Sequence, residues 1–193
     1  MARPEDFFDF ITDCTAERFL KSRSYIVAHG DYDGYSSDDK LIAALLDAGK
    51  FDGASKYISH NSLLSPRAHM YKALAWKNLN NTMGEQSEKI VAFKILEGIS
   101  LTGDGSEGRP YLVTYISDEK EFLFYINEDF KSQMLLEIND RQVDCITTKS
   151  GKAIYFDVTD CMLSAQRMFT KVKPASTTPK DEGETKKWWK FWE

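Results

Sequence analysis

The segment Leu101–Pro110 divides this sequence into two parts with different hydrophobic periodicity, and it constrains the fold more than any other stretch. Three glycines in the segment each disfavour a helix by about 1 kcal/mol, and its proline lacks the amide hydrogen that a helix requires. Apolar residues recur at helical spacing before the segment, whereas short β-branched and aromatic runs alternate with turns after it. We therefore predict an α+β fold in which a helical N-terminal half, 1–100, packs on a small antiparallel sheet within the β-rich part, 110–158.

Helix start and stop signals divide the N-terminal half. Pro4 suits the first turn of a helix whose apolar face carries Phe7 and Leu20, and Ser22–Val27 is expected to lead away from it. Capping residues, stop residues and apolar spacing predict four further helices. These helices cover Asp39–Ala48, Phe51–Ile58, Pro66–Leu79 and Glu85–Ser100.

The stretch from Lys40 to Leu79 has features of a tetratricopeptide hairpin. A Gly-Lys-Phe-Asp-Gly-Ala turn joins two apolar helices, and Ala73 and Ala75 would let helices approach closely. A solenoid needs about three repeats to bury its faces, and the sequence has no second copy at a fixed period. We therefore predict a helical, repeat-like hairpin that packs against the β-rich half.

The β-rich half contains strand-like runs separated by turn formers. Tyr111–Ile116 has the composition of a strand, and Asp118 can cap a helix over Glu119–Asn127. Three more strands are predicted, joined by the tight-turn pairs Asn139-Asp140 and Ser150-Gly151. They cover Gln133–Ile138, Gln142–Thr148 and Ala153–Val158, and such short turns require antiparallel pairing.

The end of the chain differs in composition from the rest. Thr159 and Asp160 can cap a closing helix over Cys161–Thr170, and a polar stretch rich in proline, threonine and charge follows it. We predict a single α+β domain over 1–172 with its closing helix at 160–170, a disordered linker at 173–185, and a docking tail at 186–193.

Charge and cysteine usage narrow the function. A net charge of −5 argues against nucleic acid as a partner, because nucleic-acid binders usually carry a basic face. The three cysteines form no CxxC pair and no Cys/His cluster, so we predict neither a disulfide scaffold nor a metal site, and no cofactor. The sequence shows neither a secretory signal pattern nor an apolar run near the roughly 20 residues of a membrane span. A soluble, cytoplasmic protein is expected.

The C-terminal tail is the most specific candidate site. Three of the four tryptophans lie in the last six residues, beside lysines. Tryptophan anchors suit a groove on a partner protein, an anionic membrane interface, or this protein's own core. The predicted partner- or membrane-binding residues are Lys186, Lys187, Trp188, Trp189, Lys190, Phe191 and Trp192.

Three other features point to chemistry less directly. Asp31–Asp39 holds four carboxylates, but the spacing of a calcium loop fails, so a turn with a helix cap is predicted. Thr102–Gly105 lacks the lysine and the strand-to-helix order of phosphate loops, so it is also predicted to be a turn. His29, His60 and His69 could support acid–base chemistry if the fold brought a nucleophile to them, but no local catalytic motif accompanies them.

Several short runs together resemble a bacterial family catalogued as a domain of unknown function. The runs are Ile95–Gly105 with its Gly-Asp-Gly turn, Pro110–Val113, Glu119–Leu123, Val143–Cys145 and Ile154–Asp157. The resemblance covers about 40 to 160 and leaves the tail outside. It implies an α+β fold and a bacterial source, and it implies no activity.

These observations favour a non-enzymatic bacterial interaction protein. Small size, acidity and the lack of a catalytic motif fit an adaptor, or an immunity protein that captures and neutralises a basic toxin, because charge complementarity speeds capture. The alternative is a peripheral membrane module tethered by its tail. An enzyme with a site assembled from distant residues is the third interpretation.

Overall fold

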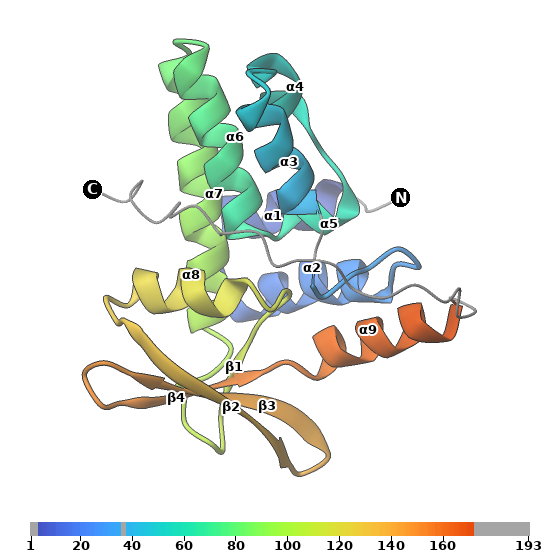
Figure 1. Ribbon diagram of the computed structural model, residues 1–193, viewed down its shortest axis with the longest axis vertical. Helices are drawn as coiled ribbons and strands as arrows, with labels where there is room; N and C mark the ends of the chain where they lie inside the picture. Colours follow the sequence, from blue (N-terminus) through green and yellow to red (C-terminus); the bar gives the residue numbers. More distant parts are fainter. Residues whose placement is uncertain (1–3, 36–37, 172–193) are drawn as a thin grey trace.

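The computed structural model describes residues 4–35 and 38–171, and these residues have the predicted α+β fold (Figure 1). Figure 1 shows α2 and α8 between the sheet and the group formed by α3, α4 and α6. The helices of the described residues are α1 (Pro4–Thr12), α2 (Ala16–Ala28), α3 (Asp38–Asp47), α4 (Phe51–Lys56), α5 (His60–Leu63), α6 (Pro66–Asn78), α7 (Thr82–Ser100), α8 (Asp118–Tyr125) and α9 (Thr159–Lys171). The strands are β1 (Tyr111–Leu112), β2 (Phe130–Ile138), β3 (Arg141–Thr148) and β4 (Ala153–Asp157).

Local signals fix most of the helix ends. The backbone of Gly49, at φ +68°, ends the turn after α3, and the hydroxyl of Ser65 caps α6 by accepting from the Ala68 amide at 3.2 Å. The side chain of Asn81 caps α7 by accepting from the Gly84 amide at 2.9 Å. The end of α3 and the start of α6 agree closely with the predicted ones, because the stop and capping residues themselves mark these boundaries. The helix α7 begins at Thr82, earlier than the predicted start at Glu85.

The N-terminal segment differs from its prediction. A break at Thr15 separates α1 from α2, and the Thr15 hydroxyl caps α2 by accepting from the Arg18 amide at 3.3 Å. The prediction that Ser22–Val27 leads away from a helix is wrong. These residues belong to α2, because Ser22 and Ile26 lie on the face of that helix that is buried.

The sheet has the strand order β1-β4-β3-β2, which places β2 at one edge. As predicted, β2, β3 and β4 pair antiparallel, whereas β1 runs parallel to β4 and makes the sheet mixed. The β2–β3 turn uses Asn139 and Asp140 at φ +51° and +61°, which is the geometry of a two-residue type I′ hairpin. Gly151, at φ +90°, serves the β3–β4 turn.

The predicted strand Tyr111–Ile116 is wrong beyond its second residue, because side chains bind the backbone that would continue the ladder. The carbonyl of Val113 accepts from the guanidinium of Arg23 at 3.0 and 2.7 Å. One carboxyl oxygen of Asp118 accepts the next two amide hydrogens at 3.1 and 2.9 Å. The chain therefore turns from β1 into α8 after two strand residues.

Two groups of buried side chains stabilise the structure. The main core joins α1, α2, α7 and α8 to the sheet and to α9, and its largest fully buried members include Tyr115, Phe10, Phe19, Phe122 and Phe156. A smaller core lies among α3, α4 and α6, and it consists of Ile42, Leu46, Ala54, Ala68 and Ala75. The repeat-like hairpin therefore buries a small face within the helical layer itself.

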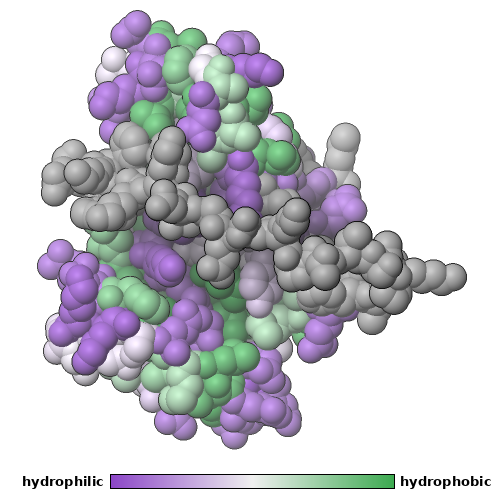
Figure 2. All heavy atoms as spheres, viewed as in Figure 1, coloured by the Kyte–Doolittle hydropathy of each residue, from purple (hydrophilic) through white to green (hydrophobic). Residues whose placement is uncertain are grey.

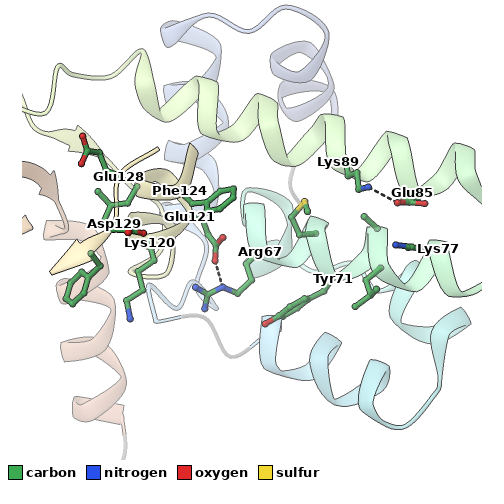
Figure 3. Close-up of a pocket in the computed structure, with 15 residues that line it drawn as sticks. Arg67, Tyr71, Lys77, Glu85, Lys89, Lys120, Glu121, Phe124, Glu128 and Asp129 are labelled. Carbon is green, nitrogen blue, oxygen red and sulfur yellow. Dashed lines mark hydrogen bonds and ion pairs between the residues drawn. The ribbon is translucent and has the colours of Figure 1, made fainter. Parts of the chain in front are cut away.

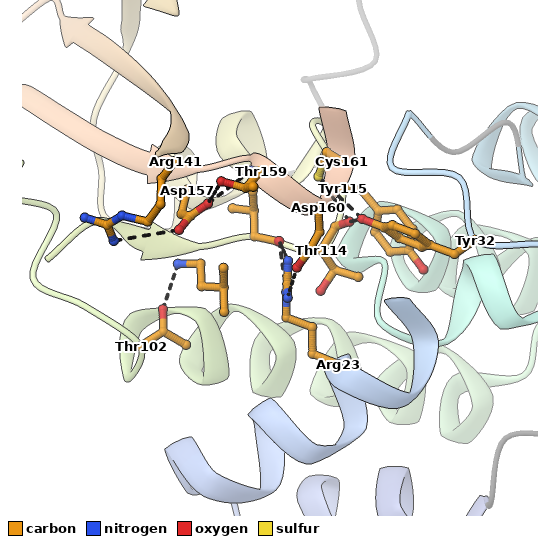
Figure 4. A network of polar contacts seen from close by, with 12 residues as sticks. Arg23, Tyr32, Thr102, Thr114, Tyr115, Arg141, Asp157, Thr159, Asp160 and Cys161 are labelled. Carbon is orange, nitrogen blue, oxygen red and sulfur yellow. Dashed lines mark hydrogen bonds and ion pairs between the residues drawn. The ribbon is translucent and has the colours of Figure 1, made fainter. Parts of the chain in front are cut away.

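Arg23 joins three distant segments at the base of the main core (Figure 4). Its side chain is 5% exposed, and besides Val113 it contacts the Asp160 carboxylate of α9 at 2.7 Å. Arginine suits this position because its planar group can donate to a carbonyl and a carboxylate at once. The contact holds α2, the segment after β1, and α9 in one arrangement.

Residues 173–185 and 186–193, predicted to be a linker and a docking tail, lie outside the described residues. Among the described residues, no helix is both long enough and apolar enough to cross a membrane.

Candidate functional site

A hollow of about 330 Å³ lies between α6, α7, α8 and the start of β2 (Figure 3). This volume is within the range of small-ligand and side-chain binding pockets. We call it the α6–α8 hollow. Its lining residues are Arg67, Met70, Tyr71, Ala73, Leu74, Lys77, Glu85, Lys89, Lys120, Glu121, Leu123, Phe124, Glu128, Asp129 and Phe130.

Helical periodicity explains one wall of the hollow. Arg67, Tyr71, Leu74 and Lys77 are three or four residues apart on α6, so they share one face of that helix. The facing wall comes from α8 and from the residues that lead into β2. The site therefore depends on tertiary packing between segments about 50 residues apart in the sequence, and only its α6 wall follows from local spacing.

Arg67 connects three helices at one end of the hollow. Its Nε lies 2.7 Å from Glu121 of α8, and its Nη1 lies 3.5 Å from Asp39 of α3. Burial alone would lower the pKa of Arg67, but these two carboxylates raise it above its usual value. Burial raises the pKa of Asp39, and the nearby guanidinium opposes that rise. The cluster positions α8 against α6 and leaves little charge for a ligand.

The other carboxylates in the wall are also paired within the protein. Glu85 contacts Lys89 at 2.6 Å, Glu128 contacts Lys152 at 2.5 Å, and Asp129 contacts Lys149 at 3.1 Å. Hydrogen bonds from Lys152 and Ser150 lower the pKa of Glu128. None of these acids is therefore an unpaired negative charge facing the hollow.

Two lysines in the wall remain without such a partner. Within residues 4–35 and 38–171, the ammonium groups of Lys77 and Lys120 make no ion pair, as Figure 3 also shows for the residues drawn there. The Lys120 ammonium lies 5.5 Å from the centre of the Phe130 ring, a cation–π geometry. The charge that the hollow offers to a ligand is therefore positive.

Exposed aromatic side chains extend the apolar surface beyond the hollow. Phe124 and Phe130, which line it, are 45% and 39% exposed. Next to them, Tyr125 of α8 packs against Phe93 of α7 with ring centres 6.5 Å apart, and Phe93 is 46% exposed. We call Phe93, Phe124, Tyr125 and Phe130 the aromatic rim, and exposed aromatic residues of this kind are typical of protein-binding surfaces.

The structure places His69 in a fully bonded position. Its Nδ1 lies 2.6 Å from Glu88, and its Nε2 donates to the Leu63 carbonyl at 3.0 Å. Burial alone would raise the pKa of Glu88, but hydrogen bonds from His69 and Lys72 lower it. Since both ring nitrogens have partners, His69 offers no free nitrogen to a substrate.

His29 and His60 form a different arrangement, a stacked pair with ring centres 3.7 Å apart. The Asp31 amide donates to Nδ1 of His29 at 3.4 Å. Burial, together with the neighbouring His29, lowers the pKa of His60, which favours its neutral form. The rings face each other, so their stacking is a packing arrangement.

The two loops considered for ion binding use their polar groups internally. Amides of Asp104 and Gly105 both donate to the Arg109 carbonyl, at 3.0 and 3.1 Å, which confirms the predicted turn. In the described part of Asp31–Asp39, the Asp38 carboxylate accepts from Ser59. No group of three or more metal-ligating side chains occurs in the described parts of the chain.

The sequence prediction and the structure emphasise different sites. The seven predicted residues, Lys186, Lys187, Trp188, Trp189, Lys190, Phe191 and Trp192, lie outside the described residues. The α6–α8 hollow was not predicted. The spacing of Arg67, Tyr71, Leu74 and Lys77 was a usable signal, but the sequence does not indicate that α8 closes over this face.

Comparison of the chain with protein-family models, with curated proteins and with solved structures found no match. The resemblance to a bacterial family therefore stays a prediction, and any function must be argued from the geometry of the site and from the composition of the tail.

Proposed function

We propose that this protein is a non-enzymatic interaction protein that binds a segment of another protein in the α6–α8 hollow. The observation that supports this proposal is the combination of an apolar hollow with positive charge at Lys77 and Lys120, which make no ion pair within the described residues. The occupant that fits is a peptide segment with an aromatic or aliphatic anchor flanked by carboxylates. The anchor would be desolvated between Tyr71, Leu74 and Phe124, and the carboxylates would meet the two lysines.

The rim favours a polypeptide over a small molecule. Phe93 and Tyr125 continue the apolar surface past the hollow, and a segment of one or two helical turns would cover them together with the anchor site. Removing these exposed aromatic rings from water would add binding energy at about 25 cal/mol per Å². A bacterial adaptor or immunity protein is the concrete form of this proposal, and its proposed location is the cytoplasm.

The test compares two synthetic peptides with the same leucine and tryptophan anchors, one with glutamate flanks and one with lysine flanks. Fluorescence anisotropy should show tighter binding of the glutamate peptide to the full chain. The Lys77→Glu/Lys120→Glu variant should reverse that preference, since it inverts the charge that the hollow presents.

Lys50→Glu is the matched control, because Lys50 is an exposed lysine outside the hollow. Equal binding of both peptides by the wild type, or the same loss with Lys50→Glu as with the double variant, would argue against the hollow as the binding site.

The tail remains the second proposed attachment site, on the strength of its three tryptophans and three lysines. Affinity capture with the full chain and with a version ending at Thr185 distinguishes attachment through the tail from attachment through the folded body. A specific protein lost on truncation would make the tail a docking peptide, and the same protein held by both versions would favour the folded body.

The membrane alternative needs its own measurement. If Lys186–Trp192 binds anionic lipid, vesicle flotation should depend on the tail and should weaken as salt rises, because salt screens the lysine–lipid attraction. Flotation that is independent of both would contradict this alternative.

A further inference from the structure

The outer strand of the sheet is unusually exposed and apolar. All nine residues of β2 are exposed or partly exposed, and Met134 and Leu135 are 58% and 46% exposed. Figure 2 shows hydrophobic side chains gathered over the β2–β3 part of the sheet. Edge strands are usually shortened, charged or covered, because an open edge can pair with a further strand. Beyond its bulge, β2 is regular from Gln133 to Ile138, and this part is long enough to pair.

The hairpin geometry identifies the backbone groups of β2 that face outward. In a two-residue type I′ hairpin, the residues that flank the turn, Ile138 and Arg141, form a hydrogen-bonded pair, and such pairs then alternate along the strands. Gln133, Leu135 and Glu137 therefore direct their amide and carbonyl groups toward the open edge. Within residues 4–35 and 38–171 no backbone group bonds to them, so a further strand can do so.

The tail, residues 186–193, has the composition of a strand that would suit this edge. Tryptophan and phenylalanine favour strands, and Trp188, Trp189 and Phe191 lie close together in the tail. The α6–α8 hollow suits the tail less well, because the charge that the hollow offers is positive and the tail carries three lysines. The open edge of β2 is therefore the better acceptor for this segment.

The connection between α9 and the tail is long enough to reach the edge. Residues 172–186 follow the end of α9, and a fully extended chain of that length spans about 50 Å. Its mean end-to-end distance as a flexible coil is about 20 Å. A folded body of this size has a radius of gyration of about 15 Å, so pairing within one chain is geometrically possible.

We propose that the tail pairs with β2 of its own chain as an additional antiparallel strand, with Trp189 opposite Leu135. This register places Lys187 opposite Glu137. Both pairs then involve outward backbone groups of β2, so both can be hydrogen-bonded pairs of the extended sheet. This inference goes beyond the proposed function and uses a surface other than the α6–α8 hollow.

The apolar side chains on both faces of the sheet agree with this register. Leu135 lies on the face toward the helices, at the edge that the helical layer leaves exposed, and Trp189 would cover it. On the opposite face, Trp188 lies opposite Leu136, which is partly buried. Cross-strand pairs of an aromatic and an aliphatic side chain stabilise a sheet, so each face contributes to the pairing.

Charge complementarity selects the direction and the register. Glu137 is exposed and makes no ion pair with another described residue, whereas Arg141, across the turn, pairs with Asp157 at 3.7 Å. In the proposed register Glu137 meets Lys187. A shift of two residues, the smallest that keeps the hydrogen-bonding pattern, would place this lysine opposite a leucine or a residue of the turn. A parallel strand with the same tryptophan–leucine pair would place it opposite a glutamine.

The test is amide hydrogen exchange of the full chain, followed residue by residue by NMR. The Leu135 amide should exchange about tenfold more slowly in the wild type than in the full-length variant Trp188→Ser/Trp189→Ser, because a tethered segment has a millimolar effective concentration. Glu137→Lys and Lys187→Glu should each reduce this protection about threefold, since each opposes two like charges. The double variant Glu137→Lys/Lys187→Glu should restore it.

The Leu136 amide is the internal control, because it bonds to β3 and should exchange alike in all variants. Glu107→Lys, a charge change on an exposed loop residue, controls for net charge, and circular dichroism checks that each variant is folded. Equal exchange of the Leu135 amide in the wild type and in the tryptophan variant would overturn the proposal.

Two further outcomes would overturn parts of the proposal. Protection that rises with protein concentration would assign the strand to the tail of a second copy and would exclude pairing within one chain. Failure of the double charge variant to recover would overturn the register. All of these outcomes are independent of the α6–α8 hollow, which the peptide-binding experiment tests separately.

Discussion

The strands β3 and β2 are neighbours in one sheet, yet their side chains lie in opposite environments. On the face toward the helices, Ile146 of β3 is fully buried, whereas Leu135 of β2, on the same face, is 46% exposed. Even the polar Asp144 of β3, which pairs with Leu135 across the two strands, is only 4% exposed. The helical layer therefore covers only the inner part of the sheet, and the apolar residues of β2 contribute little to the stability of the folded body.

The largest effect is expected at Arg23, the buried arginine that joins α2 to the segment after β1 and to α9. Arg23→Ala should lower the free energy of unfolding by about 4 kcal/mol, because it leaves the Val113 carbonyl and the Asp160 carboxylate without their partner. Urea denaturation followed by circular dichroism measures this loss. Lys21→Ala, which removes an exposed lysine of the same helix that pairs with Asp6, is the control and should cost less than 1 kcal/mol.

Several turns and helix ends could be predicted from the sequence, whereas the contacts of Arg23 could not. Asn139-Asp140 predicted the β2–β3 hairpin, and Ser65-Pro66 predicted the start of α6, because these residues specify local backbone geometry. Arg23 contacts residues about 90 and 137 positions away, and no local pattern encodes such a contact. The α6–α8 hollow was not predicted for the same reason, because its walls come from segments that are distant in the sequence.

A slightly smaller effect is expected from the buried face of the sheet. Ile146→Ala should lower the free energy of unfolding by about 3 kcal/mol, since it removes a fully buried side chain from the main core and leaves a cavity. The same denaturation experiment measures it. A loss below 1 kcal/mol would mean that the inner sheet repacks, and the contrast with β2 would then weaken.

The pH dependence of stability should report the protonation of two buried acids, Asp118 and Glu119. Burial raises the pKa of Asp118 to about 8, although two backbone amides oppose the rise, and burial with the nearby Asp144 raises the pKa of Glu119 to about 9. A carboxyl with a raised folded-state pKa binds its proton more tightly when folded. Its contribution to stability is complete below about pH 4 and declines as the pH approaches these values.

Asp118→Asn should therefore flatten this dependence. We expect the wild type to lose about 1 to 3 kcal/mol more than the variant between pH 5 and pH 8, because the amide keeps the acceptor for both amides and has no proton to lose. Thermal denaturation at a series of pH values provides the measurement. Parallel curves for the two proteins would show that Asp118 is ionised in the folded state at neutral pH.

The smallest effect is expected on the outer strand. In the version that ends at Thr185, Leu135→Ala should lower the free energy of unfolding by less than about 1 kcal/mol, since nearly half of the leucine surface is already in contact with water. Comparison with Ile146→Ala under identical conditions gives the contrast directly. A cost as large as that of Ile146→Ala would show that β2 is covered in solution even without the tail.

The small core among α3, α4 and α6 has a consequence for motion. Its buried members are Ile42, Leu46, Ala54, Ala68 and Ala75, and the larger side chains packed against them are only partly buried, so less apolar area opposes its opening than in the main core. Its amides should therefore exchange with solvent sooner than those of α7. Since α6 also forms a wall of the α6–α8 hollow, a bound segment would hold this helix in place. Slower amide exchange in α3 and α4 would then report occupancy of a site that these helices do not line.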